Sequence, residues 1–226
     1  RGEFIARQDV GDVSLPGRLA AQCAYLEKNP DTVMVASGTR FVGPENEPLY
    51  EIQRVGDELG KGLSNLDVRT IQGPSHHGSA MFRRSAYAKT GGYRPAFIVA
   101  QDIDLWLRLS EHGKLWGLSE VHYLARLAAN SISGRRRAEQ MRAGVLAIEC
   151  ARLRRSGQSD QARMEAEAFP AARTGGASNR LEMSRFYYFI GACLRKSDPS
   201  AARRYFRRAV RENPLFLRAL ARSILG

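Results

Sequence analysis

Apolar residues in the first part of the chain fall into short clusters that predict buried strands and one amphipathic helix. Residues 3–7 indicate the end of a buried strand, followed by a polar turn at residues 9–12. Apolar positions recur at helical spacing across residues 19–26, before an Asn-Pro pair that ends helices. Residues 33–36 predict a second buried strand. Because α/β proteins place their chemistry where strands end, the turn at residues 9–12 is a candidate site.

The middle of the chain carries weaker signals. Residues 43–70 are polar, rich in Gly and Glu and without a steady period, so we predict a variable loop that could include a helix. Residues 79–83 predict another strand, and residues 90–93 predict a loop with unusual backbone angles because they include two adjacent glycines. Residues 102–112 predict a helix with an apolar inner side.

From about residue 134 the composition shifts to Ala, Arg, Leu and Glu with helical periodicity up to the C-terminus. We therefore predict a boundary between an α/β domain, residues 1–133, and an all-α tail, residues 134–226. A Gly-rich break at residues 174–178 divides the tail into an arginine-rich helix pair and a second helical hairpin, at about residues 183–214.

The composition narrows the class of protein. A chain of 226 residues with 43% apolar content can bury one sizeable core and a small helical annex. Its three cysteines are far apart and odd in number, which disfavours a disulfide framework or a zinc site and favours a reducing cytoplasm. We find no apolar run of about 20 residues. The chain opens on Arg1 directly before a strand, so we expect that further sequence precedes it.

The charge of +12 and the pI near 10.2 favour anionic partners: nucleotides, phosphorylated lipids, an acidic membrane surface or nucleic acid. Nucleic acid is the least supported of these, because the sequence lacks an aromatic-basic stacking pattern and a known reader motif. We therefore expect no nucleic-acid partner.

Several segments of the chain form an ordered series of motifs. They are Phe4 to Asp12, Pro16 to Leu19 with Gln22, Asn29-Pro30, His77 to Arg84, Gly91 to Arg94, and Gln101 to Leu109. Taken in this order, they resemble the family-2 glycosyltransferases: the first segments resemble the surroundings of that family's metal-binding turn, and the others follow at about the family's spacing. The resemblance covers residues 1 to about 133. It implies part of a GT-A fold, a nucleotide-diphospho-sugar transferase α/β sandwich whose N-terminal nucleotide-binding part would precede Arg1.

The resemblance also implies an activity. Family members transfer a sugar from a nucleotide-sugar donor, here expected to be a UDP-sugar, to an acceptor hydroxyl with inversion at the anomeric carbon. The expected acceptor is a glycan or a lipid-linked glycan in bacterial cell-surface polysaccharide biosynthesis. The alternative is a non-catalytic relative that acts as a binding or scaffold protein.

The metal-binding turn of the family matches only in part. A divalent cation, Mn²⁺ or Mg²⁺, would stabilise the negative charge of the diphosphate leaving group. Asp9 matches the first carboxylate of the family's Asp-x-Asp turn, but Gly11 occupies the second position. Asp12 is the next candidate, because glycine gives the turn the freedom to shift. The alternative is that Asp9 and Asp12 cap the following helix.

The resemblance places the general base at Asp102, which would take the proton of the acceptor hydroxyl. Gln101 replaces the acidic neighbour that is usual in the family. The alternative for Asp102 is a helix N-cap, and the two roles can coexist.

The remaining candidates are implied donor- or acceptor-binding positions. His77 has a structural alternative, since a lone histidine is often part of a core. Trp106 is expected to pack in the core. Two residues after Arg126 the family often has a histidine, which is Ala128 here. The candidate binding residues are Arg7, His77, Gly91, Gly92, Gln101, Asp104 and Arg126.

The second hairpin of the tail resembles a tetratricopeptide unit. The residues that carry this resemblance are Tyr187, Gly191, Ala202, Phe206, Ala209 and Pro214. The alternative is an ordinary amphipathic hairpin. Arginines at positions 203–211 could face anionic lipid headgroups or could simply be solvated. We expect a cytoplasmic protein whose tail could also contact the inner face of the membrane.

Overall fold

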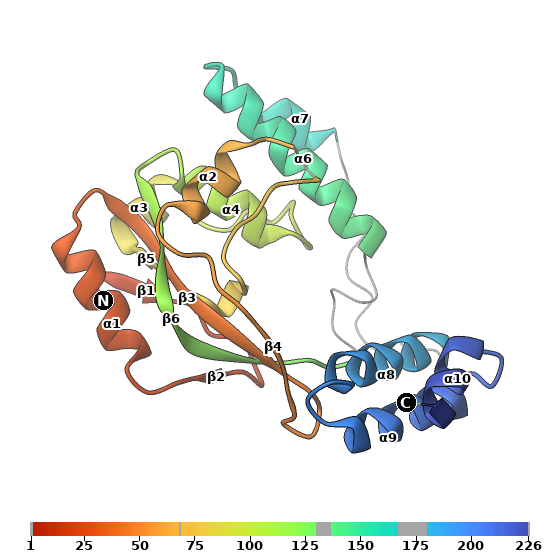
Figure 1. Ribbon diagram of the computed structural model, residues 1–226. Helices are drawn as coiled ribbons and strands as arrows, with labels where there is room; N and C mark the ends of the chain where they lie inside the picture. Colours follow the sequence, from red (N-terminus) through yellow and green to blue (C-terminus); the bar gives the residue numbers. More distant parts are fainter. Residues whose placement is uncertain (1, 68, 130–136, 167–179, 226) are drawn as a thin grey trace. The chain divides into compact units, whose positions relative to one another are not determined.

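The computed structural model describes residues 2–67, 69–129, 137–166 and 180–225. Over these residues the protein is mixed α/β, with one sheet and a helical C-terminal part (Figure 1). The described sheet has six strands in the order β1-β5-β3-β6-β2, with β4 paired to β3. The strands are β1 Phe4–Ala6, β2 Val13–Ser14, β3 Thr32–Val42, β4 Pro48–Ile52, β5 Ala80–Arg83 and β6 Lys114–Arg126.

The helices are distributed along the whole chain. Those in the first two thirds are α1 Arg18–Lys28, α2 Glu58–Ser64, the short 3₁₀ helix η1 His77–Ser79, α3 Arg84–Lys89, α4 Gln101–Leu109, α6 Arg137–Arg155 and α7 Gln161–Glu165. The last three are α8 Arg180–Leu194, α9 Pro199–Glu212 and α10 Leu217–Leu225. No helix in the described ranges is both long and apolar enough to cross a bilayer.

The chain forms two compact units. The first comprises Arg1–Arg40, Glu51–Ala125 and Arg136–Ala172, and the second comprises Phe41–Tyr50, Arg126–Arg135 and Arg173–Gly226. Helices α6 and α7, which the sequence analysis assigned to the tail, belong to the first unit. The predicted boundary at residues 133/134 and the predicted Gly-rich break at 174–178 lie outside the described residues.

The core of the first unit covers both faces of the sheet because successive strand side chains point to opposite sides. On β5, Ala80 and Phe82 join the larger cluster, which also contains apolar residues of α2, α3, α4 and α6. Met81, between them, packs with Leu26 of α1 and Val35 of β3. Trp106 is buried in the larger cluster, as expected. The sheet therefore lies between α1 and the other helices of the first unit.

Three strands were not expected from the sequence. Strand β4 lies within the 43–70 segment that we expected to be a loop, and we assigned no strand to the residues of β2 and β6. In β6 buried and more exposed residues alternate at both ends of the strand, around Leu115 and around Tyr123, but not at residues 118–122. Pairing with neighbouring strands supplies the remaining stabilisation, which a local pattern does not reveal.

The second unit contains a helical hairpin at the expected residues. Helices α8 and α9 pack closely, and a Cβ atom on Gly191 would lie only 2.8 Å from the ring of Phe206. The hairpin also packs on residues 41–50 of the same unit, where the Tyr205 hydroxyl donates to the Glu47 carboxylate (2.6 Å). The relationship to tetratricopeptide repeats stays a prediction.

Candidate functional site

The turn after strand β1 brings two carboxylates to one side. Gly11 has φ +89°, a left-handed conformation that glycine adopts without a steric penalty. The Asp12 N–H donates to the Asp9 carbonyl (3.3 Å), which closes the turn. Asp9 and Asp12 do not cap helix α1, whose N-cap is Gly17 without a side-chain cap. The alternative role for the two aspartates is therefore not observed.

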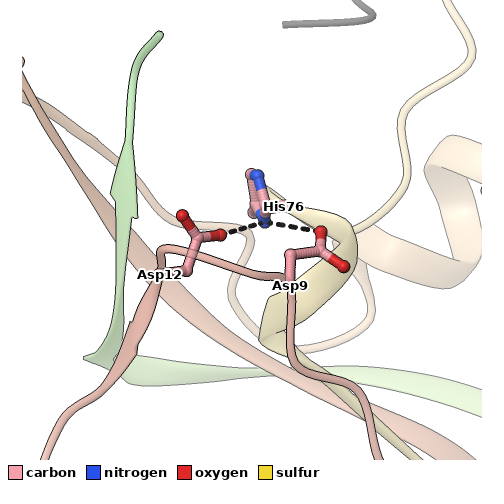
Figure 2. A group of neighbouring side chains, drawn as sticks. All are labelled: Asp9, Asp12 and His76. Carbon is pink, nitrogen blue, oxygen red and sulfur yellow. Dashed lines mark ion pairs between the residues drawn. The ribbon is translucent and has the colours of Figure 1, made fainter. Parts of the chain in front are cut away.

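A histidine from a different part of the chain faces these carboxylates. His76 Nδ1 lies 3.8 Å from Asp9 Oδ2 and 3.6 Å from Asp12 Oδ2 (Figure 2). The ligand atoms of the three side chains all lie within 4.8 Å of one another. His76 Nδ1 also accepts a hydrogen bond from the Gly78 N–H (3.1 Å) at the start of η1. Only 7% of the Asp12 side chain is exposed, so its carboxylate is almost completely removed from solvent.

Tyr123 of β6 connects the members of this cluster. Its hydroxyl donates to Asp12 Oδ2 (2.9 Å) and accepts from the Asp9 N–H (3.2 Å). Its ring stacks on the His76 imidazole, with centroids 5.3 Å apart. Burial, the hydrogen bond to Asp12 and the nearby carboxylates raise the pKa of the Tyr123 phenol, so it stays protonated and acts as a donor.

Arg18 of α1 ties the two segments of the cluster together from inside the protein. It is 1% exposed, and its guanidinium donates to the carbonyls of Arg7 (2.8 Å) and Gly78 (2.6 Å). The same group lies over the Tyr123 ring, 4.9 Å from the centroid. Arg18 therefore fixes the strand before the aspartate turn against the segment that carries His76.

His77 faces a second group of aromatic residues. Its Nε2 lies 2.7 Å from the Tyr93 hydroxyl, and its ring meets the edge of Trp106. Burial lowers the pKa of His77, while the charge of Asp102 acts in the opposite direction. Burial also raises the pKa of Tyr93 to about 12. The structure thus gives His77 a packed, neutral imidazole near Asp102.

Asp102 lies at the start of helix α4, half-buried. Its Oδ1 accepts from the Ile103 N–H (2.9 Å), but the N-cap position is occupied by Ala100, in a left-handed conformation with φ +53°. Asp102 is therefore not the N-cap residue of α4, and that alternative is wrong. A left-handed alanine costs backbone energy and is usually tolerated only where the surroundings impose it.

Asp104 has buried, structural contacts. It is 1% exposed and accepts from Arg108 Nε (3.1 Å). Arg108 in turn donates to the carbonyls of Thr90 and Gly92, each at 2.7 Å. Gly91 and Gly92 have φ +73° and +76°, which confirms the expected unusual backbone angles. Through Arg108, Asp104 holds the loop that precedes Tyr93.

The other predicted residues differ in their relation to the cluster. Arg7 joins it directly through an ion pair with Asp9 (2.9 Å), whereas Gln101 is exposed at the start of α4. Arg126 is exposed and belongs to the second unit, where it donates to the Pro44 carbonyl (3.4 Å). A groove of about 860 Å³ between α2, the start of β6 and the end of α6 includes none of the predicted site residues.

Sequence reasoning did not identify the roles of three residues at this site. His76 adjoins the predicted His77, and the pair of adjacent histidines was a signal that could have been used. Tyr123 lies on a strand that was not predicted, and Arg18 was noted only as part of a motif. Their roles depend on contacts between segments that are distant in sequence.

Two carboxylate oxygens and an imidazole nitrogen form a donor set that divalent ions accept in proteins. The cluster fits a cation by its chemistry, and the buried Asp12 carboxylate would gain from a nearby positive charge. Asp102, His77 and Tyr93 add a half-buried carboxylate and two neutral polar groups in the same unit.

Comparisons with known proteins find relatives whose names include glycosyltransferase. No family model matches the chain. A proposed glycosyltransferase, EpsE of Bacillus subtilis, is 34% identical over 128 residues, 55% of this chain and 44% of the relative. AmsE of Erwinia amylovora, named an amylovoran biosynthesis glycosyltransferase, is 26% identical over 58% of this chain and 48% of its own length. WbnJ of Escherichia coli, named an O-antigen biosynthesis glycosyltransferase, is 33% identical over 47% of this chain and 39% of its own length.

A solved structure, S. aureus TarS 1–349, matches with a TM-score of 0.41 and 11% identity, covering 99% of this chain and 64% of that one. That likeness is too low to define the fold. The chain spans less than half the length of each of the three curated relatives above. The chain is therefore similar to only a part of each relative, and the name of each relative includes the word glycosyltransferase.

Proposed function

We propose that this chain is the larger part of the catalytic domain of a family-2, GT-A type glycosyltransferase. The observation that carries the proposal is the placement of Asp9, Asp12, His77 and Asp102 in one unit, around aromatic and hydrogen-bonded supports. Similarity to three relatives named as glycosyltransferases supports it. Two of those names include amylovoran biosynthesis or O-antigen biosynthesis, and they support our proposal of a glycan or lipid-linked acceptor in cell-surface polysaccharide biosynthesis.

The reaction that we propose is a single displacement with inversion. The acceptor oxygen forms a bond to the anomeric carbon of the sugar while the bond to the nucleotide diphosphate breaks. Asp102 accepts the proton of the acceptor hydroxyl as that oxygen attacks. Held by Asp9 and Asp12, a divalent cation, Mn²⁺ or Mg²⁺, would neutralise the charge that develops on the diphosphate of a UDP-sugar.

The supporting residues contribute geometry. Tyr123 and Arg18 fix the aspartate turn, so its carboxylates need little reorganisation when a substrate arrives. The Asp104–Arg108 pair holds the loop at Gly91 and Gly92. At Gly91 no atom lies within 4 Å of the place a Cβ would take, so a sugar ring can approach the backbone there, whereas at Gly92 the Tyr87 ring occupies that place.

The proposal is tested by binding and transfer together. UDP is titrated calorimetrically into this chain and into a longer protein that includes any segment encoded upstream of Arg1, each with and without Mn²⁺. We expect Mn²⁺-dependent binding by at least the longer protein. Absence of UDP binding by both proteins would overturn the UDP-dependent enzyme and would support a non-catalytic relative.

The catalytic assignment has its own test in the protein that binds UDP. We expect Asp102→Asn to lower sugar transfer about 10²-fold or more while UDP binding stays unchanged. The matched control is Asp57→Asn, at an exposed carboxylate that pairs only with Lys61 among the described ion pairs. Transfer by Asp102→Asn at the wild-type rate would show that Asp102 is not the base.

A further inference from the structure

We propose that His76 completes a three-ligand metal site with Asp9 and Asp12, and that its imidazole makes this site select transition-metal ions such as Mn²⁺, Co²⁺ or Zn²⁺ over Mg²⁺. The inference deepens the metal-dependent part of the proposed function and rests on that function for its role in sugar transfer. Metal binding itself does not require a donor sugar, so it can be measured separately.

The distances between the three donors suit one shared ion. Protein ligands bind such ions at about 2.0–2.2 Å, so neighbouring ligand atoms around one ion lie about 3–3.5 Å apart. His76 Nδ1 is already 3.6 and 3.8 Å from the two carboxylate oxygens. The three ligand atoms all lie within 4.8 Å of one another, so side-chain movements that shorten these distances by about 0.5–1.5 Å bring all three donors to bonding distance.

The nitrogen of His76 that faces the carboxylates has the electronic form that a metal needs. Nδ1 accepts the Gly78 N–H, which places its lone pair, and no hydrogen, on that side of the ring. The neutral imidazole with an available lone pair is the form that coordinates metals. Metal binding through Nδ1 exchanges the Gly78 hydrogen bond for a coordinate bond.

The surroundings hold the ligands in place. The Tyr123 hydroxyl fixes the Asp12 carboxylate, and its ring packs nearly parallel to the His76 imidazole, at 23°. Arg18 donates to the Gly78 carbonyl two residues after His76. Such supports around ligands raise metal affinity by limiting the ligands' freedom.

The choice between ions follows from the nitrogen donor. Mg²⁺ binds oxygen ligands almost exclusively and retains several waters, so an imidazole adds little to its affinity. Transition ions gain from nitrogen ligands, increasingly from Mn²⁺ to Cu²⁺. Two carboxylates alone would accept either class, whereas two carboxylates with one imidazole favour the transition ions.

The first experiment identifies the ligand atom in the wild-type chain. Zn²⁺ and then Mg²⁺ are titrated into protein labelled with ¹⁵N at histidine, and the imidazole nitrogens are observed by NMR. We expect stoichiometric Zn²⁺ to shift the Nδ1 resonance of His76 strongly and Mg²⁺ to leave it nearly unchanged. If Nδ1 of His76 instead carries a proton and does not respond to Zn²⁺, the cluster is an ion pair and the proposal fails.

The second experiment measures selectivity by calorimetry with Co²⁺ and Mg²⁺, in the absence of any nucleotide. We expect His76→Ala to weaken Co²⁺ binding about tenfold or more and to change Mg²⁺ binding less than about twofold, while Asp12→Asn weakens both. The matched control, His112→Ala at an exposed histidine, should leave both affinities unchanged.

Equal losses of Co²⁺ and Mg²⁺ affinity in His76→Ala, or no loss at all, would overturn the proposal. Circular dichroism of each variant excludes misfolding as the cause. Selective metal binding without any sugar transfer would leave this inference standing and would count only against the proposed function.

Discussion

Tyr123 and Asp12 are joined by a 2.9 Å hydrogen bond although 111 residues separate them in the sequence. The same hydroxyl accepts the Asp9 N–H, so one phenol orients both aspartates of the turn. The candidate site therefore depends on strand β6 as much as on the turn that carries its carboxylates.

Removing that hydroxyl tests this dependence. In Tyr123→Phe the buried Asp12 carboxylate and the Asp9 N–H each lose a partner, and we expect a loss of about 1–3 kcal/mol in the free energy of unfolding. We also expect weaker binding of Co²⁺, because Asp12 is no longer oriented. Urea unfolding and calorimetry measure the two effects, and unchanged metal affinity in a destabilised variant would assign Tyr123 to stability alone.

Arg18 should contribute more to stability than any solvated arginine of the tail. Arg18→Met leaves buried carbonyls, including those of Arg7 and Gly78, without their donor, and we expect a cost of about 3 kcal/mol or more. The same substitution at the exposed Arg204 of α9 should change the free energy of unfolding by less than about 0.5 kcal/mol. Comparable values for the two variants in urea unfolding would contradict the structural role of Arg18.

The buried Asp104–Arg108 pair should be intolerant of losing one partner. Asp104→Asn leaves the Arg108 guanidinium buried without its carboxylate, and we expect a destabilisation of about 3–5 kcal/mol. The double variant Asp104→Asn, Arg108→Met should recover part of that loss, because the uncompensated charge is gone. A double-mutant cycle from thermal or urea unfolding measures this coupling, and simple additivity would argue against it.

Asp160 should make the first unit sensitive to acid. Burial alone would raise the pKa of this carboxyl, but hydrogen bonds from Arg94 and Arg154 outweigh burial and lower it below the ordinary 3.8. A lowered pKa stabilises the folded state at pH values above 3.8, and this contribution is lost as the pH falls through the lower folded-state pKa.

Comparison with Asp160→Asn isolates this contribution. The wild type should be more stable than the variant by about 1–3 kcal/mol at pH 7, and the difference should shrink as the pH falls below about 3.8. Urea unfolding at several pH values follows the difference. A gap that stays constant down to pH 2.5 would show that the charge of Asp160 is not the cause.

The sequence revealed the parts of the fold whose stabilisation is local. Helices α1 and α4 and strands β1 and β5 were expected because their apolar residues follow a clear period or run. The left-handed angles at Gly91 and Gly92 were expected because adjacent glycines favour them. Asp12 was the candidate to replace the missing carboxylate at Gly11, with helix capping as the alternative; the structure places it beside Asp9, and metal binding by the two stays a prediction.

The sequence did not reveal what depends on distant contacts. Helix α6 was assigned to the tail because its arginine-rich composition resembles the later helices, yet Leu146 and Ala147 pack in the core of the first unit. His76 was overlooked because only its position across from the aspartate turn gives it meaning. Periodicity identifies which residues are buried but does not identify their partners.

The packing of helix α9 on residues 41–50 has a consequence for anyone who cuts or fuses this protein. The second unit is assembled from three separate stretches of chain, so residues 173–226 expressed alone would lack part of their own core. Conversely, a protein ending before α8 would expose Leu49 and leave the carboxylate of Glu47 without the hydroxyl of Tyr205. Engineering at this point therefore has to treat the β3–β4 hairpin tip and the C-terminal helices as one piece.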